Sequence, residues 1–328
     1  MSKLFQVLYH DNCFDGIASA AVFTRFYRAC VDGSAAIVYQ GLAHRAGQNV
    51  DDGLLAGDEN AIVDFKYSAS DRLTWWFDHH ESAFLSQDDE RHFRRDTSGR
   101  KFHDSGFTSC TKFIASIGRN VFGFEAPDLT ELIAWADLID GAQFRDAKMA
   151  VELKEAPLQL MLVIEASRSK ELLHRLIRDF QTRSLADVAA DPEIRETFDR
   201  LYRHHLDSID IVRKSATFKD GVIHFDVSPY GLDGYNKFIP YYLFPDAVYN
   251  VGVSKSDFRS KVSVGTNPWS AHARIHNLAK LCEEYGGGGH AVVAAISFKP
   301  EELNRARTAA HEIAAKLRRD LQEESKRG

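Results

Sequence analysis

The stretch LFQVLYHDNCFDGIASA, residues 4–20, decides the fold of the first part of this chain. Residues 4–9 form a short apolar run that is typical of a buried strand, and a polar loop, residues 10–16, follows directly. Residues 17–30 are then alanine-rich and have apolar positions at helical spacing. A strand, a loop and a helix in this order predict an α/β fold built on a parallel sheet.

Polar side chains follow the other predicted strands of this sheet. Three more short β-like runs occupy residues 36–39, 61–65 and 75–77. Ligands of open parallel sheets bind beyond the carboxyl ends of the strands. Carboxylates and imidazoles stand at or near these ends, and we expect them to meet there: His10, Asp15, Asp64, Asp78, His79 and His80.

This mixture of oxygen and imidazole ligands suits divalent ions such as Mn²⁺, with Mg²⁺ as an alternative. A pair of such ions about 4 Å apart activates a water and stabilises both oxygens of an in-line phosphoryl displacement. Asp64 stands between the two groups of predicted ligands and is the expected bridge. Asp137 or Asp140, in the predicted helix that contains AWADLID (residues 134–140), is a further candidate ligand.

From residue 105 onward the chain has a different pattern. Residues 105–213 are mostly helical, with the clearest periodicity at 129–139 and 158–180 and a long connecting helix at 192–211. Strands are then predicted within 218–227, a hairpin around Asp220-Gly221, and at 248–253, 261–264 and 291–298, with helices at 271–285 and 301–326. We expect an N-terminal domain over residues 1–190, a helical linker over 191–212, and a smaller C-terminal α/β domain over 213–328.

Four glycines and a histidine, residues 286–290, separate a predicted helix from a predicted strand. Glycine backbone can approach a phosphate closely and turn its N–H groups toward it, and His290 adds a donor. The alternative is a flexible connector. The tight placement before the strand favours contact with a phosphate.

Composition excludes several classes of protein. The 328 residues, 44% of them hydrophobic, allow two domains with sizeable cores. A net charge of −6 argues against a protein that clamps long nucleic acid but permits a small anionic substrate. Four cysteines without a CxxC pair predict a reduced protein. Neither a signal peptide nor an apolar stretch of about 18–20 residues is present, so we expect a cytoplasmic protein without membrane spans.

The motifs together resemble the DHH phosphoesterases that carry a DHH-associated C-terminal domain. They follow one another in the right order over nearly the whole chain: HDNCFDGIASA (10–20), IVDF (62–65), FDHH (77–80), AWADLID (134–140) and GGGGHAVVAA (286–295). The resemblance implies a two-metal hydrolase of phosphate esters. It also implies a small nucleotide or short oligonucleotide as substrate, as for nanoRNases and phosphoadenosine-phosphate phosphatases.

The resemblance further implies roles for the matching positions. The implied metal ligands are His10 for the first ion, Asp15, His79 and Asp137 for the second, and Asp64 as the bridge, with Asp140 as the alternative to Asp137. His80 would face the substrate phosphate, and Asp78 would support the two histidines from behind. The implied substrate-binding residues are Gly287, Gly288, Gly289 and His290.

Two positions depart from the family pattern. The usual first motif carries two aspartates separated by one residue, but Cys13 stands two residues before Asp15. The partner of His10 at the first ion therefore stays open among Asp11, Asn12 and Cys13. The C-terminal domain usually has an arginine before its glycines, and residues 262–269 contain none. The candidates to replace it are Asn267, Lys261, Arg259 and Arg274.

Two other functions remain open alternatives at this point. An inorganic pyrophosphatase or polyphosphatase would use the same catalytic domain, although it has no need for a glycine-rich nucleotide-binding block. The second alternative is a non-catalytic nucleotide-binding protein whose metal site has decayed. The replacement of an expected ligand by Cys13 keeps this alternative open. The sequence permits a homodimer.

Overall fold

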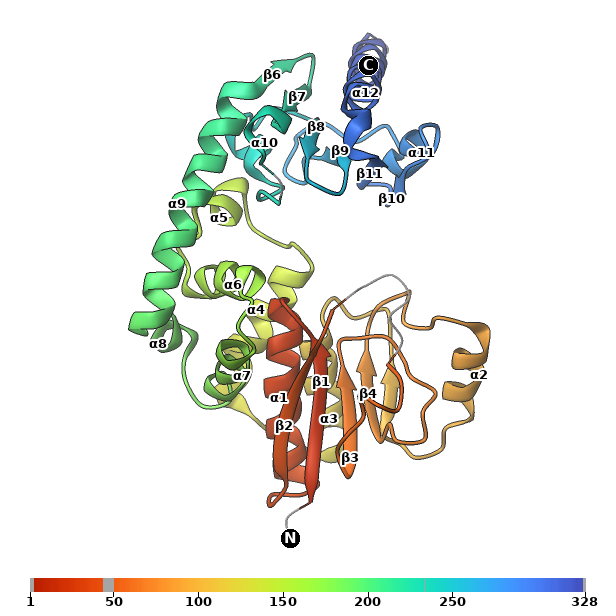
Figure 1. The fold of residues 1–328 in the computed structure, drawn as a ribbon, viewed down its shortest axis with the longest axis vertical. Coiled ribbons are helices and arrows are strands. Elements are labelled where there is room, and N and C mark those ends of the chain that lie inside the picture. The colour runs from red at the N-terminus through yellow and green to blue at the C-terminus, as the bar shows by residue number, and fades with distance from the viewer. Residues whose placement is uncertain (1–2, 44–49, 233, 327–328) are drawn as a thin grey trace. The chain divides into compact units, whose positions relative to one another are not determined.

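The structure is a computed structural model that describes residues 3–43, 50–232 and 234–326. The chain forms two compact units (Figure 1). Unit 1 consists of Met1–Phe144 and Lys154–Leu201, and unit 2 of Arg145–Leu153 and Tyr202–Gly328. The division falls within helix α9 (Pro192–Ser215), and the short helix α5 (Ala147–Glu152) belongs to unit 2.

Unit 1 is built on a five-stranded sheet in the order β2-β1-β3-β4-β5, and every neighbouring pair is parallel. Its strands are β1 (Leu4–His10), β2 (Ala36–Leu42), β3 (Glu59–Val63), β4 (Trp75–Asp78) and β5 (Lys101–His103). The predicted parallel sheet is therefore confirmed. Strand β5 was not predicted, because its three residues are only partly buried and form no apolar run.

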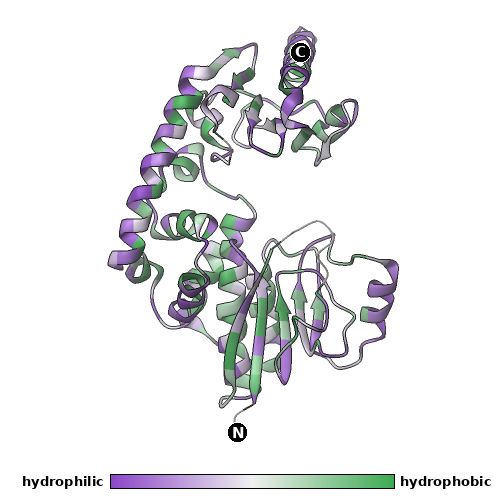
Figure 2. Cartoon of the chain, in the orientation of Figure 1, coloured by the Kyte–Doolittle hydropathy of each residue, from purple (hydrophilic) through white to green (hydrophobic). Residues whose placement is uncertain are grey.

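Helix α1 (Phe14–Cys30) is almost entirely buried, and it packs on β1 and β3 on one side and on α3 and α4 on the other. Figure 2 shows the matching hydrophobic colouring of this helix and of β1. Aromatic rings of α1 and β4 fill the interface, with Phe23 and Phe26 edge-on to Trp75 at 6.0 and 5.6 Å. This packing holds the first turn of α1 next to the ends of the strands.

The remaining elements of unit 1 are mostly helical. They are α2 (Gln87–Arg95), α3 (Cys110–Phe122), η1 (Pro127–Leu129), α4 (Thr130–Asp140), α6 (Ala156–Ala166), α7 (Lys170–Asp179) and α8 (Leu185–Ala189). The predicted periodic run 158–180 is two helices. The break lies before α7, where the side chain of Ser169 accepts a hydrogen bond from the backbone N–H of Leu172 and so starts a new helix.

Unit 2 contains a six-stranded sheet in the order β10-β11-β9-β8-β7-β6, in which only β7 and β8 pair in parallel among the described strands. The strands are β6 (Ala216–Lys219), β7 (Val222–Asp226), β8 (Tyr249–Lys255), β9 (Ser260–Thr266), β10 (Gly288–Gly289) and β11 (Val293–Phe298). The helices are η2 (Ser228–Tyr230), α10 (Ile239–Leu243), α11 (Leu278–Glu283), η3 (Pro300–Glu302) and α12 (Leu303–Ser325). The predicted hairpin at Asp220-Gly221 joins β6 to β7.

The predicted helix over 271–285 is wrong in its first half, because α11 begins only at Leu278. The phenol oxygen of Tyr249 accepts hydrogen bonds from the backbone N–H groups of Ile275 and His276 and fixes this segment outside a helix. The side chain of Asn277 then caps α11 by accepting from the N–H of Lys280.

All four cysteines lie in the described part of the chain, and none forms a disulfide. None of the helices within residues 3–43, 50–232 and 234–326 combines the length and the apolar character needed to cross a bilayer.

Candidate metal centre

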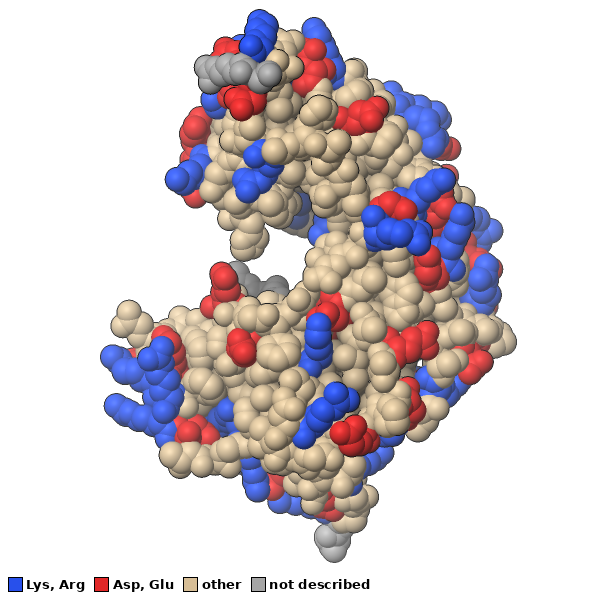
Figure 3. Space-filling model, turned by 180° about the vertical axis from the view of Figure 1, so that it is seen from behind, with Lys and Arg blue, Asp and Glu red and all other residues tan. Residues whose placement is uncertain are grey.

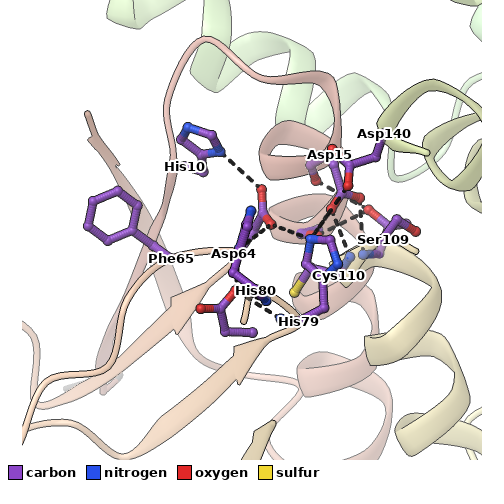
Figure 4. A network of polar contacts seen from close by, with 12 residues as sticks. His10, Asp15, Asp64, Phe65, His79, His80, Ser109, Cys110 and Asp140 are labelled. Carbon is purple, nitrogen blue, oxygen red and sulfur yellow. Dashed lines mark hydrogen bonds and ion pairs between the residues drawn. The ribbon is translucent and has the colours of Figure 1, made fainter. Parts of the chain in front are cut away.

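Asp64 lies at the middle of a cluster of acidic and imidazole side chains at the carboxyl ends of the unit 1 strands (Figure 4). It follows β3 in a left-handed backbone conformation (φ 57°), and its N–H donates to the carbonyl of Phe77. Its carboxylate is buried, with Oδ2 3.3 Å from His10 Nδ1 and Oδ1 3.5 Å from His79 Nε2. The residue predicted to bridge two ions therefore stands between two predicted ligands.

Asp15 is buried in the first turn of α1 and is held by the start of α3. Its two carboxylate oxygens accept hydrogen bonds from the backbone N–H groups of Cys110 (2.7 Å) and Thr111 (3.1 Å). N–H groups in the first turn of a helix have no partner within the helix, and they stabilise a negative charge placed against them. Gly16 allows this arrangement, since a Cβ there would lie 2.0 Å from the carbonyl oxygen of His10.

Asp78 orients both histidines that follow it. Its Oδ1 accepts from the N–H of His79 at 2.8 Å and lies 2.7 Å from Nδ1 of His80. His79 Nδ1 lies 3.0 Å from the carbonyl oxygen of Phe107, so Nδ1 carries the proton and donates. The opposite ring nitrogen, Nε2, thereby points toward Asp64 and Asp15, where it could bind a cation in the usual arrangement of a metal-binding histidine.

Asp140, the alternative at the end of α4, joins this cluster. Its Oδ2 lies 3.5 Å from His79 Nε2. Asp137, the position predicted first, instead pairs with Lys112 at 2.6 Å and accepts from Ser109 at 3.4 Å. In the described part of the chain Asp137 belongs to none of the groups of side chains close enough to share an ion, whereas Asp140 belongs to one with Asp15 and His79. The geometry favours Asp140 over Asp137.

His10 at the end of β1 and Cys13 at the start of α1 both face Asp64, and the ligand atoms of these three residues lie within 4.8 Å of one another. Asn12 is turned away, because its amide donates to the carbonyls of Ile164 (3.2 Å) and Ser167. Asp11 accepts from the N–H of Asn12, and its carboxylate lies against Gly41, where a Cβ would approach it to 2.7 Å. Of the three open candidates, only Cys13 lies with His10 and Asp64.

The carboxylates of Asp15, Asp64 and Asp140 shift one another's pKa values. Burial and the charge of Asp64 raise the pKa of Asp15 well above its usual value and that of Asp140 to about 6. Burial would also raise the pKa of Asp64, but the neighbouring imidazoles of His10 and His79 outweigh it and lower that pKa to about 2. Burial lowers the pKa of His79, but Asp64 and Asp15 outweigh it and raise that pKa to about 10. The raised pKa values of Asp15 and Asp140 reflect burial and repulsion between neighbouring carboxylates, which a bound cation would relieve.

Three buried atoms of the cluster, Asp64 Oδ1, Asp78 Oδ2 and His79 Nε2, have no hydrogen-bond partner among the described residues, and Asp64 Oδ1 faces His79 Nε2 at 3.5 Å. Buried polar atoms are normally paired, because leaving one unsatisfied costs about 1–3 kcal/mol. Three overlapping groups of possible ligands contain Asp64 or His79: His10, Cys13 and Asp64; Asp64, His79 and His80; Asp15, His79 and Asp140. The donor set fits divalent ions with mixed oxygen and nitrogen ligands.

The glycine block in unit 2 forms the turn from α11 into the edge strand β10. A Cβ on Gly287 would lie 2.4 Å from the carbonyl oxygen of Ala295, and one on Gly289, at φ 145°, 2.6 Å from the backbone of Ala294. These two glycines therefore allow close packing on β11. Gly288 has open space at the Cβ position, and His290 is exposed while its N–H donates to the carbonyl of Val293.

Asn267 does not lie open to a substrate. It is 4% exposed, and its amide donates to the carbonyls of Pro245 (3.0 Å) and Ala247 (2.8 Å) while its Oδ1 accepts from the N–H of Trp269. The protein itself satisfies this side chain, which braces the loop before β8. The structure thus gives Asn267 a structural explanation in place of the predicted contact with substrate.

Comparisons with known proteins address the fold. No protein-family model matches the sequence, and no curated protein matches it either. A pGpG-specific phosphodiesterase from Vibrio cholerae, PggH, is similar in structure over 98% of this chain and 99% of its own, with a TM-score of 0.71 at 16% identity. Thermus thermophilus RecJ in complex with Mn²⁺ has a TM-score of 0.57 at 12% identity, over 96% of this chain but only 52% of RecJ.

A third solved structure is a DHH domain from a protein described as a member of a family of ribosomal proteins. It has a TM-score of 0.57 at 12% identity and covers 94% of this chain and 86% of its own. All three likenesses extend over both units of the chain. The chain therefore has the fold of the DHH phosphoesterases that its motifs resemble.

Proposed function

We propose that this protein is a metal-dependent phosphoesterase that hydrolyses phosphate esters of small nucleotides or short oligonucleotides. The observation that carries the proposal is the buried cluster around Asp64, in which Asp64 Oδ1 and His79 Nε2 lack hydrogen-bond partners among the described residues. A binding protein with a decayed metal site has no reason to keep this unsatisfied, negatively charged arrangement.

Two groups of residues would hold the ions. His10 and Asp64 belong to the first, and Asp15, Asp64, His79 and Asp140 to the second. Mn²⁺ is the proposed ion and Mg²⁺ the alternative, and solved structures of RecJ with this fold carry one or the other. Bound there, such ions activate a water and neutralise charge on the phosphoryl group.

His80 is the proposed contact to the scissile phosphate. The hydrogen bond between its Nδ1 and Asp78 holds the ring in one orientation, and about a third of the side chain is exposed. The same bond raises the pKa of His80, so a larger fraction of the rings is protonated near neutral pH. A protonated imidazole donates a strong, charge-assisted hydrogen bond to a phosphate oxygen. Asp78 acts by positioning His80.

The proposed substrate is a linear dinucleotide or a similarly short molecule. PggH, which has the same fold, is described as pGpG-specific. The chain has a net charge of −6, and on the face drawn in Figure 3 acidic and basic side chains are interspersed. Binding of a long strand requires many phosphate contacts and therefore a basic surface. We further propose that Gly287, Gly288, Gly289 and His290 hold the part of the substrate that does not react.

A panel of substrates in Mn²⁺ tests this function. It should contain pGpG and other linear dinucleotides, cyclic dinucleotides, adenosine 3′,5′-bisphosphate, a long single-stranded oligonucleotide and pyrophosphate. We expect a linear dinucleotide or nucleoside bisphosphate to be turned over fastest, with a shallow dependence on salt. Equal turnover of the long oligonucleotide with a steep salt dependence would refute the short substrate. Activity on pyrophosphate alone would establish the pyrophosphatase alternative.

A further inference from the structure

Cys13 occupies the helix start of α1, but its side chain makes no capping hydrogen bond. Its backbone has the extended conformation of an N-cap residue (φ −127°, ψ 136°), and its carbonyl accepts from the N–H of Ile17 at 3.1 Å. Serine, threonine, aspartate and asparagine are preferred at this position because their oxygen caps the helix. Cys13 provides no such hydrogen bond, so helix capping does not explain why a cysteine stands at this position.

The Cys13 thiol lies beside two other side chains that can bind a metal ion. Its sulfur lies within 4.8 Å of a ring nitrogen of His10 and a carboxylate oxygen of Asp64. Asp64 is 1% exposed, and its Oδ1 has no hydrogen-bond partner among the residues that the structure describes. That oxygen faces His79 Nε2 at 3.5 Å, whereas Oδ2 faces His10 Nδ1 at 3.3 Å. The buried carboxylate thus presents one oxygen to each of the two proposed ion positions, and a cation beside His10 and Cys13 would offset its desolvation.

The other cysteines do not share this setting. Cys110 is fully buried and its thiol donates to the carbonyl of Phe77, Cys30 is exposed at the far end of α1, and Cys282 packs into the core of unit 2. Only Cys13, among the described cysteines, belongs to a group of side chains that could share an ion.

We propose that Cys13 binds, through its sulfur, the ion held by His10 and Asp64, and that this position selects a softer divalent ion than the second position does. Thiolate ligands favour Zn²⁺, Fe²⁺ or Co²⁺, whereas carboxylates and water favour Mn²⁺ and Mg²⁺. The second position, formed by Asp15, Asp64, His79 and Asp140, offers only oxygen and nitrogen. The two positions would then hold different metals. This inference rests on the proposed function, because Cys13 can act as a ligand only if the centre binds metal ions.

Cobalt is a direct probe of a sulfur ligand. Metal-free full-length protein is titrated with Co²⁺, and a sulfur-to-cobalt charge-transfer band in the near ultraviolet is expected to appear. The band should be absent from Cys13→Ser and unchanged in Cys30→Ser, the matched control. Alkylation followed by mass spectrometry gives a second measurement on the unmutated protein, in which Zn²⁺ should protect Cys13 and leave Cys30 reactive.

The Cys13→Asp variant tests metal selection, because it restores two aspartates separated by one residue. Its affinity for Zn²⁺ relative to Mn²⁺, measured by competition with a chelating dye, should fall by at least about tenfold, since changes at metal-site side chains commonly alter affinity 10–100-fold.

The outcomes separate the two proposals. If Co²⁺ binds without a charge-transfer band, and metal leaves the alkylation of Cys13 unchanged, the sulfur ligand is refuted while the metal centre stands. If no divalent ion binds at all, the proposed function fails together with it.

Discussion

The candidate metal centre of unit 1 and the glycine block of unit 2 were both predicted as functional sites, and the structure explains them differently. At the metal centre, buried oxygen and nitrogen atoms converge and some have no partner among the described residues. In unit 2, Gly287 and Gly289 make room for β11, and the protein satisfies the amide of Asn267 itself. Convergent buried ligand atoms point to a bound ion, whereas residues that the fold already uses need no ligand to explain them.

The largest effect is expected at Asp64. An Asp64→Asn variant keeps the size of the side chain and tolerates the left-handed backbone, but it loses the charge shared by both ion positions. Loss of several kcal/mol of transition-state stabilisation should lower kcat/KM by about 10³-fold or more. Turnover of pGpG and elemental analysis of bound metal check this. If the variant binds both ions as tightly as the parent, Asp64 is not a bridge.

Two acids of α4 form a matched pair. Asp140→Asn should lower metal affinity and activity by at least about 100-fold, because Asp140 lies against His79. Asp137→Asn should leave both nearly unchanged, because it removes only a partly exposed ion pair with Lys112, which typically contributes less than about 1 kcal/mol. Metal titrations of the two variants decide between them. The reverse ranking would show that the first prediction, Asp137, was correct.

His290 tests whether the glycine block also serves the substrate. A hydrogen bond to a charged phosphate contributes about 1.5–3 kcal/mol, so His290→Ala should lower kcat/KM on a dinucleotide roughly 10- to 150-fold. Turnover of bis-p-nitrophenyl phosphate, which has no second phosphate, should barely change, and metal content should stay the same. An equal loss on both substrates would mean that His290 acts in the chemistry or in the fold.

The smallest effects are expected from two neighbouring glycines. Gly287→Ala should lower the free energy of unfolding by about 1–3 kcal/mol, because its Cβ would clash with Ala295. Gly288→Ala meets nothing within 4 Å, so its stability in urea should equal that of the parent. Its KM for a dinucleotide should nevertheless rise several-fold if a phosphate approaches this backbone. An unchanged KM would leave the glycines with a structural role alone.

Much of the fold could be predicted because the strands of unit 1 are short apolar runs. The starts of β1 and β4 were predicted at Leu4 and Trp75, where the structure has them. The predictions that failed did so because of contacts with residues far away in the sequence. Helix α11 starts late because Tyr249 holds the preceding segment, and no pattern within residues 271–277 reports this contact.

The site could be predicted where a strand end sets the position. Asp64 and His79 follow β3 and β4 directly, so the parallel sheet brings them together. The choice between Asp137 and Asp140 depends on which of them pairs with Lys112, a residue of another helix. Two backbone contacts could not be predicted from a sequence motif: the N–H of Cys110 holds Asp15, and the carbonyl of Phe107 orients His79. Ser109, a residue type that favours the start of a helix, indicates where the N–H groups of α3 become available.

The hydrogen bonds of Asn12 have a consequence for the order of events during synthesis. This side chain ties the loop between His10 and Cys13 to the carbonyls of Ile164 and Ser167, which lie 152 and 155 residues later. At about 5–20 residues per second, a ribosome adds that length of chain in roughly 8 to 30 s. During that interval the first strand and helix exist without the segment that anchors their loop. The loop therefore reaches its final conformation only after α6 has emerged, so the first-made part of the centre is among the last to be completed.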